Sequence, residues 1–206
     1  NEYLLRGESV MMKLKTKENM KTRDMILISM FAALTAVGAF IKIPTPIVPF
    51  TLQFVFCAYA GIFLGAKHGL YSQLLYVGIG LIGIPIFSNG GGITYIFQPT
   101  FGYLIGFITC AFVVGKLTEG LKEVKLWRIL GAVLCGLFFV YFFGVAYLYM
   151  IVNLYLGKAM TVKGAIAAGF LPYITSDFIL SILVALTAVH VIPALRKSGL
   201  IKVTEK

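Results

Sequence analysis

Charged residues are scarce in this chain. Asp, Glu, Lys and Arg together make up 13% of its 206 residues, whereas hydrophobic residues make up 59%. Soluble domains carry about 25% charged residues. A chain of this length cannot bury so much apolar surface inside itself, which excludes an ordinary soluble domain. The apolar side chains must therefore face a lipid bilayer, and the expected class is an all-α integral membrane protein.

The side chains of common catalytic and metal sites are also rare. The chain has eight acids, two histidines and three cysteines. No G-x-S-x-G or H-E-x-x-H motif occurs, and the nearest approach to a phosphate loop, residues 115–117, lacks the spaced glycine and the Ser or Thr. The cysteines lie in apolar runs and are interpreted as small core residues: Cys57, Cys110 and Cys135. We therefore predict no enzymatic activity, no cofactor and no metal.

Apolar runs divide the chain into six predicted transmembrane helices. A helix needs about 20 apolar residues to cross the hydrocarbon core. The predicted spans are 24–41, 51–65, 69–84, 100–117, 129–154 and 176–193. Lys67 and His68 are predicted to form a tight turn between the second and third spans. Residues 1–19 are polar and are predicted to be an extension, with a leader, a tag remnant, a misassigned start or a surface helix all left open; the membrane domain is 20–206.

The basic residues predict the orientation of these helices. With both termini in the cytoplasm, only Lys42, Lys158 and Lys163 of the 18 basic residues fall in outer loops. Positive charge concentrates on the cytoplasmic side of membrane proteins. The net charge of +10 therefore indicates membrane orientation rather than nucleic-acid binding, because the basic residues lie between apolar runs and not along one element. The expected location is a bacterial inner membrane, with multiple spans.

Asp177 is the one acid of the eight that lies at the mouth of a span, in LPYITSDFILSIL, whereas the other seven lie in polar segments or at a helix end. A charged side chain at the centre of a membrane helix costs about 2.5–3.5 kcal/mol, so it normally has a partner or a function. Two interpretations remain open. The carboxylate can cap the helix start, or it can contact a ligand, and the two roles are compatible.

The segment 85–99, PIFSNGGGITYIFQP, is a second unusual feature because it carries no charge. Gly90, Gly91 and Gly92 permit close backbone approach. The segment also supplies neutral hydrogen-bonding groups and apolar walls, which suit a mostly neutral ligand: Asn89, Thr94, Tyr95, Gln98, Phe87 and Phe97. A plain flexible connector is the alternative.

Three further features have both a structural and a functional interpretation. Gln53 can bond another helix or support a ligand. Lys42 can reach the lipid headgroups or attract a ligand carboxylate. The small residues Ala32 and Ala36 permit close helix approach, either inside this protein or against another subunit.

Four segments resemble the BioY family in order and spacing: IKIPTPIVPFTLQ (41–53), GLIGIPIFSNGGG (80–92), QPTFGYLIGF (98–107) and LPYITSDF (171–178). The resemblance covers about residues 20–197. The third segment departs from the family pattern G-P-T-G-G-Y, since Gln98 and Phe101 replace glycines.

The resemblance implies a six-helix S-component fold that binds biotin from outside. It also implies partners: a membrane coupling subunit (T component) and two cytoplasmic ATPases, as in an energy-coupling factor (ECF) vitamin transporter. The residues that it implies for substrate binding are Asp177 and Asn89 at the ureido ring, Gln53 as support, Tyr95, Phe87 and Tyr103 as walls, Gly91 in the glycine-rich loop and Lys42 at the valerate end. Ala32 and Ala36 are implied for the coupling-subunit interface.

The residues alone leave the ligand open. An S component for riboflavin or thiamine would share the fold and differ in its loops. An intramembrane enzyme using Asp177 would need a second catalytic group near the outer face, and a structural scaffold would tolerate loss of Asp177 and Asn89.

Overall fold

The computed structural model describes residues 22–45, 47–121 and 123–197, so the predicted extension 1–19 lies outside the described residues. The elements follow in the order α2 (Thr22–Phe40), β1 (Lys42–Ile43), β2 (Phe50–Thr51), α3 (Gln53–Ile82), η1 (Ile93–Phe97), α4 (Phe101–Thr118), α5 (Leu126–Leu154), α6 (Val162–Gly169) and α7 (Ile174–Lys197). Five of the described helices, α2, α3, α4, α5 and α7, are long and apolar enough to cross a membrane. The prediction of an all-α membrane fold is therefore confirmed.

Helix α3 is a hairpin of two helical arms, 53–64 and 66–82. Its backbone leaves the helical region at Gly65, where φ is 79° and ψ is 179°. A Cβ placed on Gly69 would lie 3.1 Å from the carbonyl oxygen of Ala60, whereas nine residues of continuous helix span roughly 13 Å. The arms correspond to the second and third predicted spans.

The turn between these arms differs from the predicted one. Lys67 and His68 lie in the first turn of the second arm, and the chain reverses at Gly65 instead. The positive φ explains the choice, because glycine alone adopts it without strain. The carboxylate of Glu119 then accepts a hydrogen bond from the Ala66 N–H at 2.9 Å, so α4 caps the start of the second arm.

Glycines bring α4 into backbone contact with its neighbours. A Cβ on Gly61 would lie 2.6 Å from the Ala111 carbonyl oxygen, and one on Gly115 would lie 2.4 Å from the Ala66 nitrogen. On the opposite side of α4, a Cβ on Gly106 would lie 2.7 Å from Val140 Cα. Small residues allow such close packing in membranes, where dispersion contacts replace the hydrophobic effect.

Two other boundaries differ from the predicted ones. Pro193 was expected to end the last span, but α7 continues past it to Lys197. Between the fifth and sixth predicted spans, where the sequence predicts no helix, α6 begins at Val162, and the Thr161 hydroxyl accepts from the Gly164 N–H at 3.1 Å. A proline without an N–H can be tolerated in a membrane helix where other groups satisfy the freed carbonyl.

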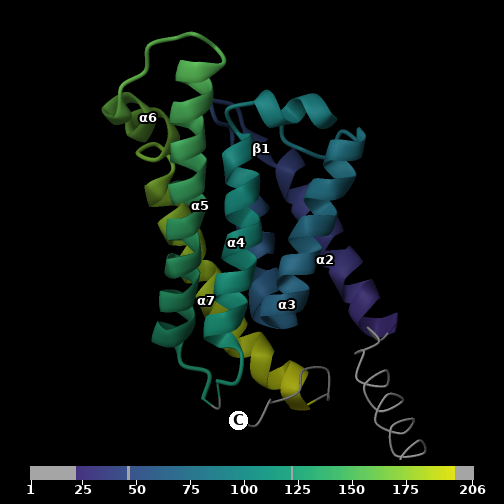
Figure 1. Ribbon diagram of the computed structural model, residues 1–206. Coiled ribbons are helices and arrows are strands. Elements are labelled where there is room, and N and C mark those ends of the chain that lie inside the picture. The colour runs from purple at the N-terminus through teal and green to yellow at the C-terminus, as the bar shows by residue number, and fades with distance from the viewer. Residues whose placement is uncertain (1–21, 46, 122, 198–206) are drawn as a thin grey trace, which may run out of the picture.

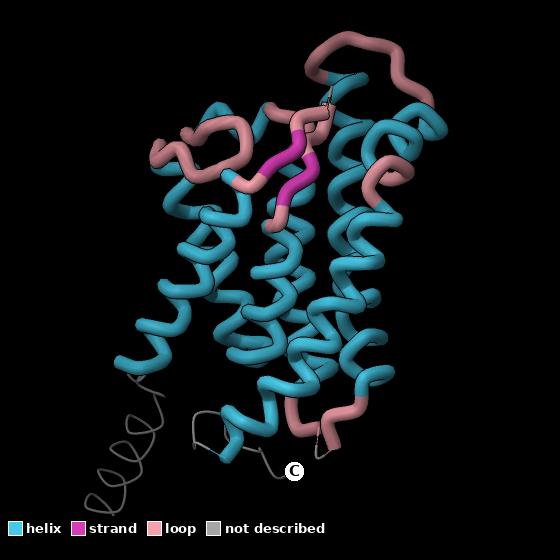
Figure 2. Tube along the Cα trace, turned by 180° about the vertical axis from the view of Figure 1, so that it is seen from behind, coloured by secondary structure: helices cyan, strands magenta, loops and turns pink. Residues whose placement is uncertain are grey.

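The elements connect at two opposite ends of the helical bundle. The β1–β2 hairpin, η1 and α6 gather at the upper end in Figure 1, and the loop between α4 and α5 lies at the lower end with the start of α2 and the end of α7. In the hairpin, Lys42 pairs with Thr51 and Ile43 with Phe50. From behind, the hairpin lies over the upper ends of the helices (Figure 2). This upper end is the one with the loops that sequence analysis assigned to the outer face.

Candidate functional site

A small cavity lies at the upper end, between the β1–β2 hairpin, the segment 85–99 and α4. Its volume is about 50 Å³. Its lining consists of Val48, Pro49, Thr51, Gln53, Ser88, Tyr95, Thr100, Tyr103, Leu104 and Phe107. Pockets for drug-sized ligands measure roughly 300 Å³ or more, so the lining must move apart to admit a ligand of that size. Apolar walls with a few placed polar groups fit a small, mostly neutral organic molecule.

Gln53 belongs to a buried hydrogen-bonded chain on one side of this cavity. Its Nε2 donates to the Tyr76 hydroxyl at 2.8 Å, and Tyr76 donates to the Ile86 carbonyl at 3.1 Å. The Gln53 Oε1 accepts from the Thr51 hydroxyl at 2.9 Å. Gln53 therefore links the two arms of α3 and the segment 85–99, and it also faces the cavity.

Aromatic rings form the wall behind this chain. The Phe87 and Tyr95 rings lie 4.5 Å apart, and Tyr76 packs edge-on against Phe87 at 5.4 Å. The Phe87 ring occupies the place where a side chain on Gly80 would project. The Tyr95 hydroxyl is 2.9 Å from that of Thr100 and 3.3 Å from that of Ser88. Tyr95 lines the cavity, and Phe87 supports it from behind.

Asn89 lies in a tight turn, and Gly91 directly follows it. Two backbone hydrogen bonds between Phe87 and Gly90, of 2.9 and 3.2 Å, close the turn. Asn89 is at the exposed tip of this turn and outside the cavity lining. Gly91 packs against backbone, since a Cβ there would lie 2.3 Å from the Ile84 carbonyl oxygen. The predicted contact of Asn89 with a ligand therefore requires the turn to move inward, and it remains a prediction.

Lys42 lies on β1 and ties the hairpin to the same turn. Its Nζ donates to the Ser88 carbonyl at 2.5 Å. The ammonium group is thus used in a structural contact at the edge of the cavity. Its predicted role with a ligand carboxylate remains a prediction.

Asp177 is in the first turn of α7 and is 8% exposed. Its Oδ2 accepts a hydrogen bond from the Tyr141 hydroxyl, which comes from the middle of α5. Tyr103 lies within electrostatic range of Asp177, and its hydroxyl donates to the Gly169 carbonyl at 2.8 Å. Tyr103 also lines the cavity, so it connects this second cluster to the first.

The structure therefore places most of the predicted residues at the upper end of the molecule, but only some of them line the cavity. Gln53, Tyr95 and Tyr103 line the cavity, and Phe87 packs against Tyr95 behind it. Lys42 bonds the Ser88 carbonyl beside the cavity, and Asn89 and Gly91 lie in the neighbouring turn segment outside the lining. Asp177 is outside the lining and bonds Tyr141. The hydroxyl partners Tyr76, Tyr141 and Tyr173 are not among the residues predicted from the sequence. The available signal was a tyrosine inside or at the mouth of an apolar span, because a buried phenol normally finds a hydrogen-bond partner.

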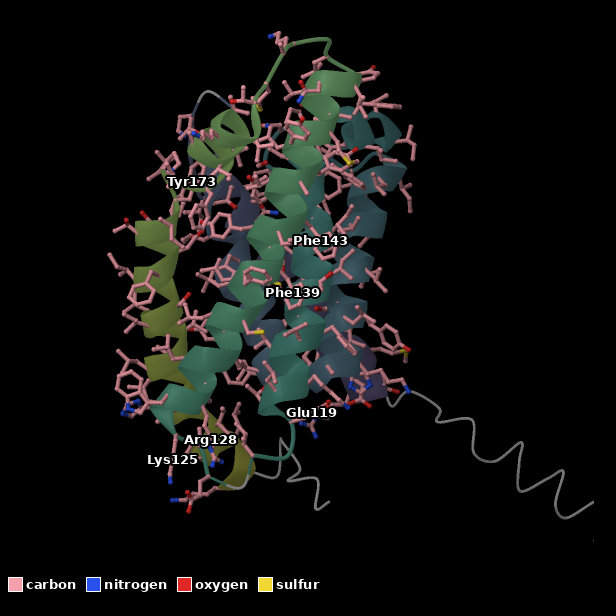
Figure 3. The ribbon with its side chains drawn as sticks, turned by 60° about the vertical axis from the view of Figure 1, so that its left-hand side comes forward. Glu119, Lys125, Arg128, Phe139, Phe143 and Tyr173 are labelled. Carbon is pink, nitrogen blue, oxygen red and sulfur yellow. The ribbon has the colours of Figure 1, made fainter. Side chains whose placement is uncertain are left out.

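Tyr173 holds the β1–β2 hairpin over the cavity. It lies at the upper end of the molecule, far from Glu119 and Arg128 (Figure 3), and is 6% exposed. Its hydroxyl donates to the Val48 carbonyl and is 2.7 Å from the Thr45 hydroxyl. Since Val48 and Pro49 line the cavity, these bonds connect the cavity roof to the start of α7.

Loss of the Tyr173 hydroxyl is expected to loosen this roof. In Tyr173→Phe, the ring keeps its packing while Val48 and Thr45 lose a partner, so we expect ligand to associate and dissociate several-fold faster with a smaller change in affinity. Stopped-flow binding kinetics measure this. Tyr149→Phe, at a partly exposed position on α5, is the matched control and should change neither rate. Unchanged association and dissociation rates in Tyr173→Phe would show that the Tyr173 hydroxyl does not hold the hairpin over the cavity.

Ala32 and Ala36, predicted for a subunit interface, face inward to different degrees. Ala32 is 4% exposed and belongs to the core, and Ala36 is partly buried against it. The exposed positions of the same helix include the larger Met30 and Val37 and also the small Ser29 and Ala33. The close approach of α2 to its neighbours thus uses Ala32 and Ala36 within the chain, and the interface role remains a prediction.

These features define a class: a helical membrane protein with several candidate spans and a small cavity beneath loops at one end. The BioY family model matches residues 12–197, and the chain belongs to the BioY family. It is 46% identical over 184 residues to a probable biotin transporter BioY of Lysinibacillus sphaericus, covering 89% of this chain and 94% of that protein. It is 39% identical to the biotin transporter BioY of Thermotoga maritima, covering 82% and 95% of the two chains.

A solved structure shares the architecture. The S-component for biotin from an ECF-type ABC transporter superposes with a TM-score of 0.73 and 25% sequence identity, covering 88% of this chain and 95% of that one. The expected resemblance to the BioY family and its fold is confirmed.

Proposed function

We propose that this chain is the biotin-binding S component of an ECF-type transporter, capturing biotin at the outer face. The observation that carries the proposal is the membership of the BioY family over nearly the whole chain. A buried carboxylate, Asp177, and a small cavity support it. The relatives named as biotin transporters support biotin over riboflavin or thiamine.

The proposed site uses both clusters. Asp177 accepts from the ureido N–H groups, and Asn89 donates to the ureido oxygen once the 87–90 turn moves inward. Tyr95 and Tyr103 enclose the ring system, with Phe87 behind them, and Gln53 orients the wall. Lys42 exchanges the Ser88 carbonyl for the valerate carboxylate. Tyr103 lines the cavity and lies within electrostatic range of Asp177, which supports this assignment.

The proposed orientation has six membrane crossings with both termini in the cytoplasm. The hairpin form of α3 supports six crossings, since the chain reverses at Gly65 and the two arms run in opposite directions. The charged residues Glu119, Lys125 and Arg128 lie at the lower end, opposite the site (Figure 3). That end would face the coupling subunit and two ATPases in a bacterial inner membrane.

A pair of cysteine variants tests the orientation. A membrane-impermeant maleimide added to intact cells should label Asn89→Cys and leave Glu123→Cys unlabelled until the membrane is opened. Both positions are exposed, which makes them a matched pair. Labelling of Glu123→Cys alone in intact cells would reverse the proposed orientation.

Uptake of labelled biotin by cells without their own biotin transport tests the function. Cells that express this chain with a coupling subunit and its ATPases should accumulate biotin, and an ATPase inactive in hydrolysis should abolish the ATP-driven part. No accumulation by cells that contain the assembled complex would contradict the proposal.

A further inference from the structure

The segment between α3 and α4 has two faces of opposite character. Toward the protein, Tyr95 is 3% exposed and lines the cavity. Away from it, Ile93 and Phe97, on the same short helix η1, are 65% and 47% exposed. Residues 83–100 contain no charged side chain. Solvent-facing loops rarely combine exposed isoleucine and phenylalanine with a complete lack of charge.

The exposed face of η1 continues into the outer ends of two membrane-crossing helices. The Phe97 ring stacks on that of Tyr155, with centroids 4.7 Å apart, and Tyr155 directly follows the end of α5. On the other side, the Gly92 N–H donates to the Gly80 carbonyl at 2.7 Å, which holds the start of η1 against the end of α3. Figure 1 shows η1 lying across the upper end of the bundle.

Six exposed apolar residues on η1 and at the neighbouring ends of α3 and α5 are called the apolar rim here. Its members are Ile82, Ile84, Ile93, Phe97, Leu154 and Tyr155, of which Ile82 is 85% exposed and Leu154 is 82% exposed. Ile82 and Leu154 are the last residues of α3 and α5, two helices long and apolar enough to cross a membrane, and the rim carries two aromatic rings. Aromatic side chains concentrate where headgroups meet acyl chains, and short elements with one apolar face bind there.

We propose that η1 and the adjoining rim are embedded in the headgroup–acyl boundary of the outer leaflet, so that lipid supports one wall of the ligand cavity from outside. The occupant of the rim is lipid, and neither a second copy of this chain nor a protein partner. The link to a ligand cavity and the choice of the outer leaflet rest on the proposed function and orientation, whereas the contact with lipid does not.

Tryptophan quenching in lipid nanodiscs tests this inference on the full chain. The native Trp127 lies at the start of α5, at the other end of the molecule, and is replaced in a Trp127→Phe background. Phe97→Trp then places the probe in the rim. Lys158→Trp, in the charged loop at the same end, is the matched control. Phospholipids brominated near the top of their acyl chains are the lipid quencher, and iodide is the aqueous quencher.

We expect the brominated lipids to quench the Phe97→Trp variant at least twofold more strongly than the Lys158→Trp variant, and iodide to show the reverse order. Equal access of iodide to both probes would place the rim in water and overturn the inference. Protection of the rim probe from both quenchers would mean that protein covers the rim, which also overturns it. Ile93→Trp is a second probe should Phe97→Trp fail to fold. Biotin binding measured on the same variants reports on the proposed function separately, because the quenching needs no ligand.

Discussion

Replacing Asp177 by alanine will weaken biotin binding at least tenfold, which corresponds to about 1.4 kcal/mol of binding free energy. The carboxylate is the one buried acid among the described residues, and it lies within electrostatic range of Tyr103, which lines the cavity. A carboxylate that accepts two ligand N–H groups in a water-poor site leaves them unpaired when it is removed. Equilibrium binding to the purified variant measures the effect.

Two variants separate a ligand contact from a structural role. Asp177→Asn keeps the size of the side chain and one acceptor oxygen, so it should bind biotin more weakly than the parent but remain folded. Tyr141→Phe removes the hydrogen bond to Asp177 without removing the carboxylate. Glu123→Ala, which removes an acid from an exposed ion pair, is the control and should bind normally. Unchanged affinity in folded Asp177→Ala would remove Asp177 from the site.

Replacing Gly61 by alanine will destabilise the protein by about 1–3 kcal/mol, the usual cost of overpacking a well-packed interior. The new methyl group would lie 2.6 Å from the Ala111 carbonyl oxygen and 3.0 Å from the Gly115 nitrogen. Both are backbone atoms of α4, so no side-chain rotation can relieve the contact. The helices must separate, which lowers the unfolding temperature in detergent.

Gly78→Ala is the matched control in the other arm of α3, where nothing lies within 4 Å of the new Cβ. That variant should be as stable as the parent or slightly more stable, because alanine favours the helix over glycine. Equal unfolding temperatures for Gly61→Ala and Gly78→Ala would contradict the close packing of α3 against α4.

The helices were predictable because each apolar run is long enough to cross a bilayer and ends at polar or proline residues. The reversal within α3 was placed two residues late, since Lys67 and His68 are polar but the positive φ belongs to Gly65. The predicted end of the last span at Pro193 was wrong because α7 continues to Lys197. Composition cannot indicate whether a neighbouring group will satisfy the carbonyl that a proline leaves free. The short helix α6 was hidden in a segment too brief to show helical periodicity.

The candidate site was predictable where the polar residue stands out against apolar neighbours, as Asp177 and Gln53 do. The tyrosines were harder, because their rings suit the core and only their hydroxyl groups carry a signal. Tyr141 from α5 and Asp177 from α7 meet only through tertiary packing, as do Tyr173 and Val48. The exposed position of Asn89 follows from the tight turn closed by Phe87 and Gly90, which the glycine run alone did not define.

Equilibrium binding of labelled biotin to the purified, detergent-solubilised protein tests the central claim most directly, with riboflavin and thiamine as competitors. A label is preferable to intrinsic fluorescence because Trp127 lies at the end of the molecule opposite the cavity. We predict saturable, tight binding of one biotin per chain that neither competitor displaces. Absence of biotin binding by a folded sample, or displacement of biotin by riboflavin or thiamine, would contradict the assignment.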